Sequence, residues 1–451
     1  MQLTDSQMQA YIVNGYVTVQ TDFPPDFHAH IYQQAEEIIA VKNPWNDIYP
    51  MIPELAAVFA HPTVSGVLTS ILGPNYIMHP HRHCHHNPPG SQAQSKHKDS
   101  YEEDENVHHH RTRWAMGFYY PQDVPLEMGP SAVQPTTQYY NTTQRANNCP
   151  ELPLPGKAGT VTIIHYDLWH RGLANSTDTN RYMLKFLFCR TEEPQSPSWQ
   201  SQSQAWASPS HLNPHLNPPH HHEQLWQSMW QWHMGQSMPP PTQSLNGQMN
   251  DYLSQLSNNS VDETQRVDAA YALGNMGEAV VPHLMDALYT EVKTTHAANL
   301  TKEHTNPSET YTGYALAAVG APAVPALTSA LSDDAWWMRA CAADILGDIG
   351  LAAQSSVPAL TVAMNDSSMW VRRNAAEALG IMGSGAASAV DVLADTMMHD
   401  DSDMVRHNAA LALVRLGDNA RPATSVLREA INDENLYVSG NSKIALERME
   451  R

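Results

Sequence analysis

The sequence predicts a multidomain protein with a β-rich N-terminal domain, a double-stranded β-helix or jelly roll with flanking helices, and a C-terminal all-α solenoid. Short alternating runs bounded by Pro, Gly and Asn clusters follow residue 75. An Ala- and Leu-rich pattern closed by glycine repeats from about residue 261, after a stretch rich in Gln, Ser, Pro and His. We therefore expect a first domain at 1–236, a linker at 237–250 and a solenoid at 251–451.

Composition limits the functional classes. The 451 residues allow two to four domains, and 25 basic against 46 acidic residues give a net charge of −21, which argues against nucleic-acid binding. The sequence shows no apolar run of about 18 residues and no basic leader with an apolar core, so we expect neither a membrane span nor a signal peptide. The four cysteines form no CxxC pair and indicate reduced thiols in a cytoplasmic protein.

The elements of the first domain follow in order. Thr4 and Gln7 form a capping-box pattern before a short helix that ends at Asn14 and Gly15. The alternating YVTVQ motif predicts a strand at 16–20, and a helix is expected over about 27–41. Further strands are expected at 76–86, 113–120, 160–165 and 182–190.

The stretch at 195–250 has the composition of a linker but contains three tryptophans close together. Trp226 and Trp230 are four residues apart and would share one face of a helix. Because disordered linkers rarely carry such aromatics, we expect a short helix here that docks on the N-terminal domain.

The C-terminal units resemble HEAT repeats of the short bacterial type. Their closing glycines recur 30–43 residues apart, and Met338–Arg339, Val371–Arg372 and Val405–Arg406 occupy matching positions, the first two before an Ala-Ala-x-x-Leu-Gly ending. An insertion at about 295–312 lengthens one unit. The resemblance implies a surface that binds a partner protein or mediates self-association, or a scaffold without chemistry.

Three residues have the spacing of a metal site. His97 and Asp99 are two apart, on one face of a strand or its end, and His170 follows 71 residues later. Two histidines and a carboxylate are the facial triad of non-haem Fe(II) oxygenases. Arg181 begins a predicted strand eleven residues later and could clamp a carboxylate with two hydrogen bonds. A second HxD, His165-Tyr166-Asp167, lacks a suitable third ligand.

These residues resemble the phytanoyl-CoA dioxygenase family of iron and 2-oxoglutarate oxygenases. The opening LTDSQMQAYIVNGYVTV and the segments 116–138 and 158–184 are similar to that family in the same order. The resemblance implies Fe(II) on His97, Asp99 and His170, the distal carboxylate of 2-oxoglutarate on Arg181, and O₂ as oxidant for a hydroxylation or related oxidation. The chain departs from the family at Gln138, where histidine is common, and at Gly172, where a hydroxyl residue is common.

The roles of several other histidines and of Trp114 can each be interpreted in two ways. The histidines of 79–86 either line a substrate pocket or auxiliary metal site, or are polar barrel-lining residues; they are His79, His81, His83, His85 and His86. His108–His110, after an acidic run, is expected in a solvated loop or lid, and His220–His222 is expected to be exposed. Trp114 either belongs to the core or stacks on a ligand.

Two functions from different classes follow. The first is an Fe(II)- and 2-oxoglutarate-dependent dioxygenase acting on a small-molecule, carrier-bound or protein-bound substrate, with the solenoid binding a partner or a second copy. The second is a HEAT-repeat scaffold whose oxygenase-like domain is catalytically idle. A 2-oxoglutarate decarboxylation assay distinguishes them.

Overall fold

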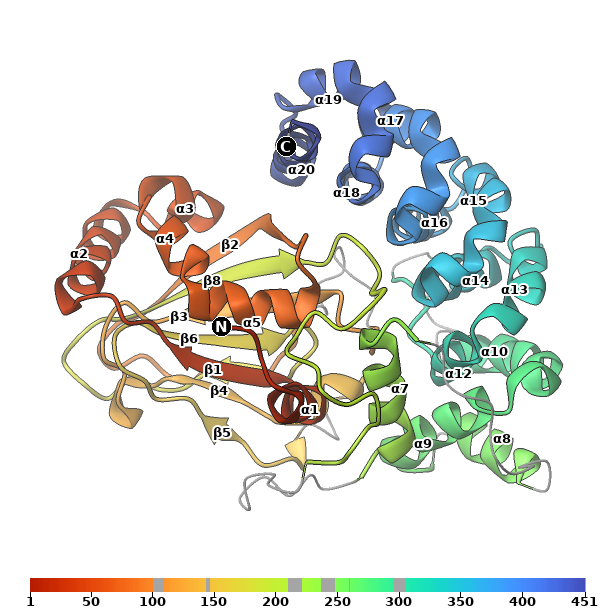
Figure 1. Ribbon diagram of the computed structural model, residues 1–451, viewed down its shortest axis with the longest axis horizontal. Coiled ribbons are helices and arrows are strands. Elements are labelled where there is room, and N and C mark those ends of the chain that lie inside the picture. The colour runs from red at the N-terminus through yellow and green to blue at the C-terminus, as the bar shows by residue number, and fades with distance from the viewer. Residues whose placement is uncertain are drawn as a thin grey trace. The chain divides into compact units, whose positions relative to one another are not determined.

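The computed structural model describes residues 1–99, 109–142, 147–209, 221–236, 248–258, 260–295 and 305–450. The chain divides into two compact units (Figure 1). The first contains most of residues 1–221. The second contains residues 222–451 and two short segments from earlier in the chain, 102–111 and 191–195.

The first unit contains two antiparallel sheets, an arrangement compatible with the expected jelly roll. The larger sheet has the order β1-β6-β3-β8-β2 and the smaller one the order β5-β4-β7. The strands are β1 (Tyr16–Gln20), β2 (Ile77–Asn87), β3 (Trp114–Tyr119), β4 (Ser131–Val133), β5 (Leu152–Pro153), β6 (Thr160–His165), β7 (His170–Gly172) and β8 (Arg181–Cys189). The four longer strands predicted beyond residue 75 correspond to β2, β3, β6 and β8.

Several helices flank the larger sheet. They are α1 (Asp5–Asn14), α2 (Pro25–Val41), α3 (Ile48–Met51), α4 (Leu55–Ala60) and α5 (Pro62–Leu72), with a 3₁₀ turn η1 (Trp45–Asp47) before α3. The predicted capping box of Thr4 and Gln7 starts α1. Phe59 of α4 packs on Phe186 of β8, with ring centroids 4.5 Å apart. Every residue of β8 is buried, because helices cover one face of the strand and the interior of the unit covers the other.

The second unit is a stack of helix pairs, as the repeats predict (Figure 1). One layer contains α9 (Glu263–Gly274), α12 (Tyr311–Val319), α14 (Trp336–Ile349), α16 (Met369–Met382), α18 (Asp403–Leu416) and α20 (Leu436–Met449). The other contains α10 (Val281–Thr295), α13 (Val324–Ala330), α15 (Val357–Ala363), α17 (Val390–His399) and α19 (Thr424–Ala430). The predicted closing glycines from Gly320 to Gly417 end the helices of the first layer with positive φ, which glycine adopts without strain.

Ion pairs between arginine and aspartate side chains join successive repeats. Arg339 Nε lies 2.6 Å from Asp366, and Arg372 Nε lies 2.7 Å from Asp400, in each case reaching the aspartate of the next repeat. Asp366 Oδ1 also accepts a hydrogen bond from the amide of Ser368, at the start of α16. Asp366 and Asp400 therefore each hold the turn that leads into a helix and bind the arginine of the preceding repeat, which explains why both residue types recur in the sequence.

By length and composition alone, two helical stretches, Trp336–Ala363 and Met369–His399, are long and apolar enough to cross a membrane. A further pair of helices, bent by 109° relative to one another, meets the same criterion only if the two are counted as one span. Each of the two is a pair of repeat helices that meet at a glycine with positive φ, Gly350 or Gly383. In each stretch, more than half of the apolar 18-residue window is buried (56% and 61%). Packing between repeats therefore accounts for their apolar composition.

The tryptophan-bearing segment forms a helix, α7 (Glu223–His233), in which Trp226 and Trp230 are fully buried. The sequence assigned this helix to the first domain, whereas the structure groups it with the helical unit, where it packs against α9. The boundary at residue 236 stays a prediction. His222, expected to be exposed, is instead buried, with Nδ1 2.6 Å from Asp268 Oδ1. His220 lies outside the described residues.

Candidate metal centre

Backbone pairing brings the two predicted histidine ligands together. His97 and His170 form an isolated antiparallel bridge in which each amide donates to the other carbonyl oxygen, at 3.0 Å both ways. His170 is the first residue of β7, whose strand partner is β4. The two imidazole centroids are consequently 4.5 Å apart, although 72 residues of chain lie between the two bridge positions.

Both imidazoles are oriented by their own backbone. Nδ1 of His97 lies 3.0 Å from the carbonyl oxygen of Ser95, and Nδ1 of His170 lies 2.9 Å from that of Leu168. A carbonyl oxygen accepts only, so each Nδ1 carries the proton and each Nε2 keeps its lone pair. Metal-binding histidines are commonly held in this way.

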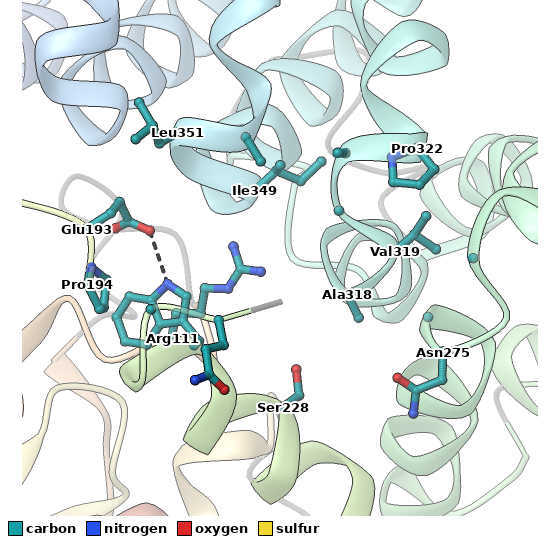
Figure 2. Close-up of a pocket in the computed structure, with 18 of the residues that line it drawn as sticks. Arg111, Glu193, Pro194, Ser228, Asn275, Ala318, Val319, Pro322, Ile349 and Leu351 are labelled. Carbon is teal, nitrogen blue, oxygen red and sulfur yellow. Dashed lines mark hydrogen bonds between the residues drawn. The ribbon is translucent and has the colours of Figure 1, made fainter. Parts of the chain in front are cut away.

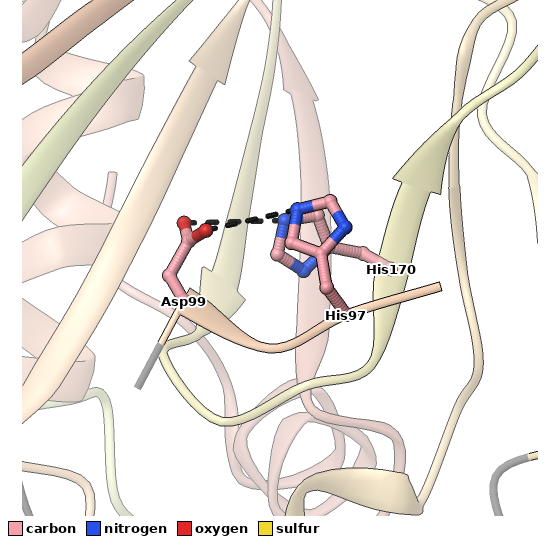
Figure 3. A group of neighbouring side chains, drawn as sticks. All are labelled: His97, Asp99 and His170. Carbon is pink, nitrogen blue, oxygen red and sulfur yellow. Dashed lines mark ion pairs between the residues drawn. The ribbon is translucent and has the colours of Figure 1, made fainter. Parts of the chain in front are cut away.

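Asp99 completes the triad (Figure 3). Its Oδ1 lies 3.7 Å from Nε2 of His97, and its Oδ2 lies 4.0 Å from Nε2 of His170. An ion with bonds of about 2.1 Å can bridge atoms up to about 4.2 Å apart. Within the described parts of the chain, this is the one group of three or more His, Cys, Asp or Glu side chains close enough to hold a metal ion.

Lys185 of β8 is a member of the site that the sequence analysis missed. Its Nζ lies 2.7 Å from Asp99 Oδ2, and both side chains are largely buried. Burial alone would raise the pKa of Asp99, but Lys185 and His170 outweigh it and hold that pKa well below its usual range. Burial lowers the pKa of His170 to about 4, so its imidazole is neutral at physiological pH. The available signal was a lysine inside the apolar strand RYMLKFLFC, since buried lysines are nearly always paired.

Arg181 is buried at the start of β8. Its Nη2 lies 3.3 Å from Ser131 Oγ, and its guanidinium carbon lies 5.8 Å from the Tyr120 ring centroid. Its Nε is buried and has no hydrogen-bond partner among the described residues. A buried guanidinium with a spare donor has the chemistry to bind a carboxylate, and that role of Arg181 stays a prediction.

The two departures from the family pattern have structural explanations. The side-chain amide of Gln138 donates to the carbonyl oxygens of Ile12 and Val13 at the end of α1, at 3.0 and 3.3 Å. This residue therefore connects α1 to the segment that follows β4 of the smaller sheet. The amide of Gly172 donates to Oε1 of Gln94 at 2.8 Å, and a Cβ at this glycine would lie 3.1 Å from that oxygen. Gln94 therefore occupies the space next to β7 that a larger residue would need.

The histidines of β2 separate into groups with different surroundings. His86 stacks on Tyr182, with ring centroids 5.0 Å apart, and His79 meets Trp114 edge-on at 5.3 Å. His83 and His85 lie together, with centroids 4.2 Å apart. Trp114 is buried in β3, which favours its core reading. The β2 histidines therefore do not form one cluster.

The expectation of a solvated loop at His108–His110 is wrong for its described part. His109 and His110 are buried in the helical unit. Nε2 of His109 lies 3.1 Å from Asp344 Oδ1, and the His110 ring stacks on Tyr314 with centroids 4.0 Å apart. The sequence could not reveal this, because the partners lie more than 160 residues away. His108 and the acidic run at 102–105 lie outside the described residues.

A pocket of about 560 Å³ lies within the helical unit (Figure 2). Its lining includes Arg111, which donates to the carbonyl oxygens of Asp348 and Ala317, and Glu193, which accepts from Nε1 of Trp232 at 3.1 Å. The cation and the carboxylate are thus already hydrogen-bonded inside the unit. The pocket holds no catalytic arrangement of described side chains comparable to the triad.

Family models match both parts of the chain. Residues 11–183 match the family described as phytanoyl-CoA dioxygenase (PhyH). Residues 324–413 and 357–447 match HEAT repeats, and residues 265–290 match the PBS lyase HEAT-like repeat. The search of curated proteins gave no match to the chain.

Several solved structures are similar to part of the chain. The non-heme alpha ketoglutarate dependent epimerase SnoN from nogalamycin biosynthesis shares 16% identity, with a TM-score of 0.37, covering 42% of this chain and 83% of that one. The carbocyclase SnoK from the same biosynthesis shares 16% identity, with a TM-score of 0.36, covering 43% and 88%. EctD from S. alaskensis with bound Fe shares 17% identity, with a TM-score of 0.36, covering 45% and 82%.

Proposed function

We propose that this chain, which carries a phytanoyl-CoA dioxygenase domain at residues 11–183 and HEAT repeats in its C-terminal part, is an Fe(II)- and 2-oxoglutarate-dependent dioxygenase. The observation that carries the proposal is the convergence of His97, Asp99 and His170, with both Nε2 atoms facing the carboxylate. Two imidazoles and one carboxylate suit Fe(II) and leave coordination positions for other ligands.

Each residue of the site has a distinct role in this proposal. His97, Asp99 and His170 would hold the iron, and Arg181 with Ser131 would bind the distal carboxylate of 2-oxoglutarate through the donors described above. When bound, iron and 2-oxoglutarate supply the activation of O₂ that oxidises an unactivated C–H bond. Lys185 holds Oδ2 of Asp99, which directs the other carboxylate oxygen toward the metal position.

The wider setting of the enzyme is also a proposal. The four cysteines are buried thiols that form no disulfide, which supports a cytoplasmic location. The HEAT repeats would bind a partner protein or a second copy, as stacked repeats of this kind commonly do. The substrate would be a small molecule, free or attached to a carrier or protein.

The test is an anaerobic titration of the intact chain with Fe(II) and 2-oxoglutarate. We expect a visible metal-to-ligand charge-transfer band, and consumption of 2-oxoglutarate once O₂ is admitted. His97→Ala and His170→Ala should abolish both signals while circular dichroism stays unchanged. His30→Gln, a substitution of an exposed histidine of α2, should retain them. A wild-type chain with no band and no 2-oxoglutarate consumption would support the idle scaffold instead.

A further inference from the structure

The side of the larger sheet that faces the triad is identified by the pairing of β2 with β8. His83 lies directly opposite Lys185, His85 opposite Met183, and Asn87 opposite Arg181. Residues directly opposite in a ladder share a face of the sheet. Lys185 contacts Asp99, so His83 and His85 lie on the face that carries the metal centre.

Among the described residues, these two imidazoles have ring contacts but no hydrogen-bond partner, unlike their neighbour His86. The ring nitrogens of His83 and His85 make no hydrogen bond to any residue that the structure describes, although both side chains are partly buried. His86, on the opposite face, has Nε2 3.0 Å from Asn180 Oδ1. Partly buried polar groups normally find a partner, so His83 and His85 are suited to bind a ligand.

Burial disfavours the charged form of both imidazoles. Burial and the nearby Lys185 lower the pKa of His83 to about 4, and the same two causes place the pKa of His85 well below its usual value. A neutral imidazole offers one donor and one acceptor. Two cations lie on this face: Lys185 is already paired with Asp99, and Arg181 is assigned in the proposed function to the carboxylate of 2-oxoglutarate. The surface therefore favours an uncharged polar ligand over an anionic one.

Trp45 extends this surface toward solvent. Its ring centroid lies 4.8 Å from that of His83, and the residue is 58% exposed. Its φ of +53° is unusual for a large side chain, and such outliers concentrate at functional sites. Asn43 Oδ1 accepts from the Trp45 amide at 2.9 Å and stabilises this conformation. An exposed indole next to two imidazoles offers aromatic faces for a planar ring.

We infer that Trp45, His83 and His85 form the substrate-recognition surface of this enzyme, and that its substrate is an uncharged planar ring bearing hydroxyl or carbonyl groups. The inference rests on the proposed function of the triad. The indole stacks on the ring, and the imidazoles exchange hydrogen bonds with its oxygen substituents. A plain acyl chain would cover the imidazole nitrogens without satisfying them.

The experiment is equilibrium dialysis of the intact chain with 7-hydroxycoumarin, an uncharged planar ring below neutral pH, at pH 6.5. Octanoate is the comparison ligand. We expect a dissociation constant below about 1 mM for the ring and weaker binding of octanoate. His83→Phe, His85→Asn and Trp45→Ala should each weaken ring binding at least about tenfold. Trp45→Phe should keep most of the affinity, and His86→Phe, on the opposite face, should leave it unchanged.

The charge-transfer band with Fe(II) and 2-oxoglutarate is recorded for the same proteins and separates the two proposals. A band in the wild-type chain without ring binding, or with octanoate preferred, overturns this inference alone. An equal loss of affinity in His86→Phe also overturns it. A missing band in the wild-type chain overturns the proposed function and this inference with it. The variants at residues 45, 83 and 85 should keep the band, which also shows that they fold.

Discussion

At the residue scale, the candidate site depends on which atoms are already used by the protein. The Nδ1 atoms of His97 and His170 are bound to backbone carbonyl oxygens, and Oδ2 of Asp99 is bound to Lys185. The atoms left over are two Nε2 lone pairs and one carboxylate oxygen. Hydrogen bonding thus selects a facial set of ligand atoms from side chains that could each have pointed elsewhere.

The spare donor of Arg181 gives the first prediction. In Arg181→Gln, the apparent dissociation constant for 2-oxoglutarate should rise about 10- to 100-fold, because a hydrogen bond to a charged group contributes about 1.5–3 kcal/mol. Titration of the charge-transfer band measures this. Arg171→Gln, which removes a partly exposed pair with Glu151, is the control and should leave the constant unchanged. Equal constants in all three proteins would contradict the assignment.

At the element scale, the segment 109–111 is held by the helical unit through a buried ion pair. Burial lowers the pKa of His109, but Asp344, Asp348 and Glu377 outweigh it and raise the pKa to about 9. Because the folded pKa lies above the unfolded value of about 6.5, the stabilisation is complete below pH 6.5 and is lost as the pH rises through about 9.

The second prediction concerns that pH range. The free energy of unfolding of the wild-type helical unit should fall between about pH 6.5 and 9, by at most about 3 kcal/mol. His109→Gln should be less stable at pH 6.5 and should lack this fall. Denaturant titrations at several pH values, followed by far-UV circular dichroism, measure both. The same slope in variant and wild type would show that another group is responsible.

The close contact of α16 with α18 gives the third prediction. A Cβ at Gly380 would lie 2.8 Å from Cα of Ala412, so a helix must move to admit it. We expect Gly380→Ala to destabilise the unit by about 1–3 kcal/mol, despite the usual gain of about 1 kcal/mol for this change in a helix. Scanning calorimetry measures it. Val362→Ala, at a 74% exposed position, should change stability by less than about 0.5 kcal/mol.

At the scale of the whole molecule, the division into units does not follow the order of the chain. The described residues 109–111 and 191–195 belong to the helical unit, although the described chain up to residue 99 and from residue 112 belongs to the first unit. The metal-ligand candidate Asp99 is ten residues from His109, whose partner Asp344 is in α14. The repeats therefore bury and bind the segment 109–111, and they are not only an appended binding module.

The fourth prediction follows from this arrangement. Deleting residues 251–451 removes Asp344, Tyr314 and Tyr271, and leaves His109 and His110 without their buried partners. We expect the shortened chain to be mostly insoluble or to melt well below the full chain, as measured by soluble yield and thermal unfolding. Deleting only 424–451, the last helix pair, leaves those partners in place and should cost less. A stable 1–250 chain would contradict the prediction.

Much of the fold was predictable because its signals are local. The period of the glycines and the Ala-Ala-x-x-Leu-Gly endings predicted the helix pairs, and alternation predicted the longer strands. The short strands β4, β5 and β7 have two or three residues each, which is too short for an alternating pattern of apolar and polar residues to be recognised in the sequence. The surroundings of His109, His110 and His222 were predicted wrongly, since composition does not reveal a partner distant in the chain.

The sequence by itself determined the repeat architecture, and it identified His97, Asp99, His170 and Arg181 as candidate site residues, because spacing and residue type are contained in the sequence alone. Only the tertiary structure decided that three of them converge, that Lys185 binds Asp99, and that His83 and His85 lie on the same face of the sheet as Lys185. The physical reason is that convergence depends on strand register and on hydrogen bonds between residues far apart in the chain, which one-dimensional spacing does not contain.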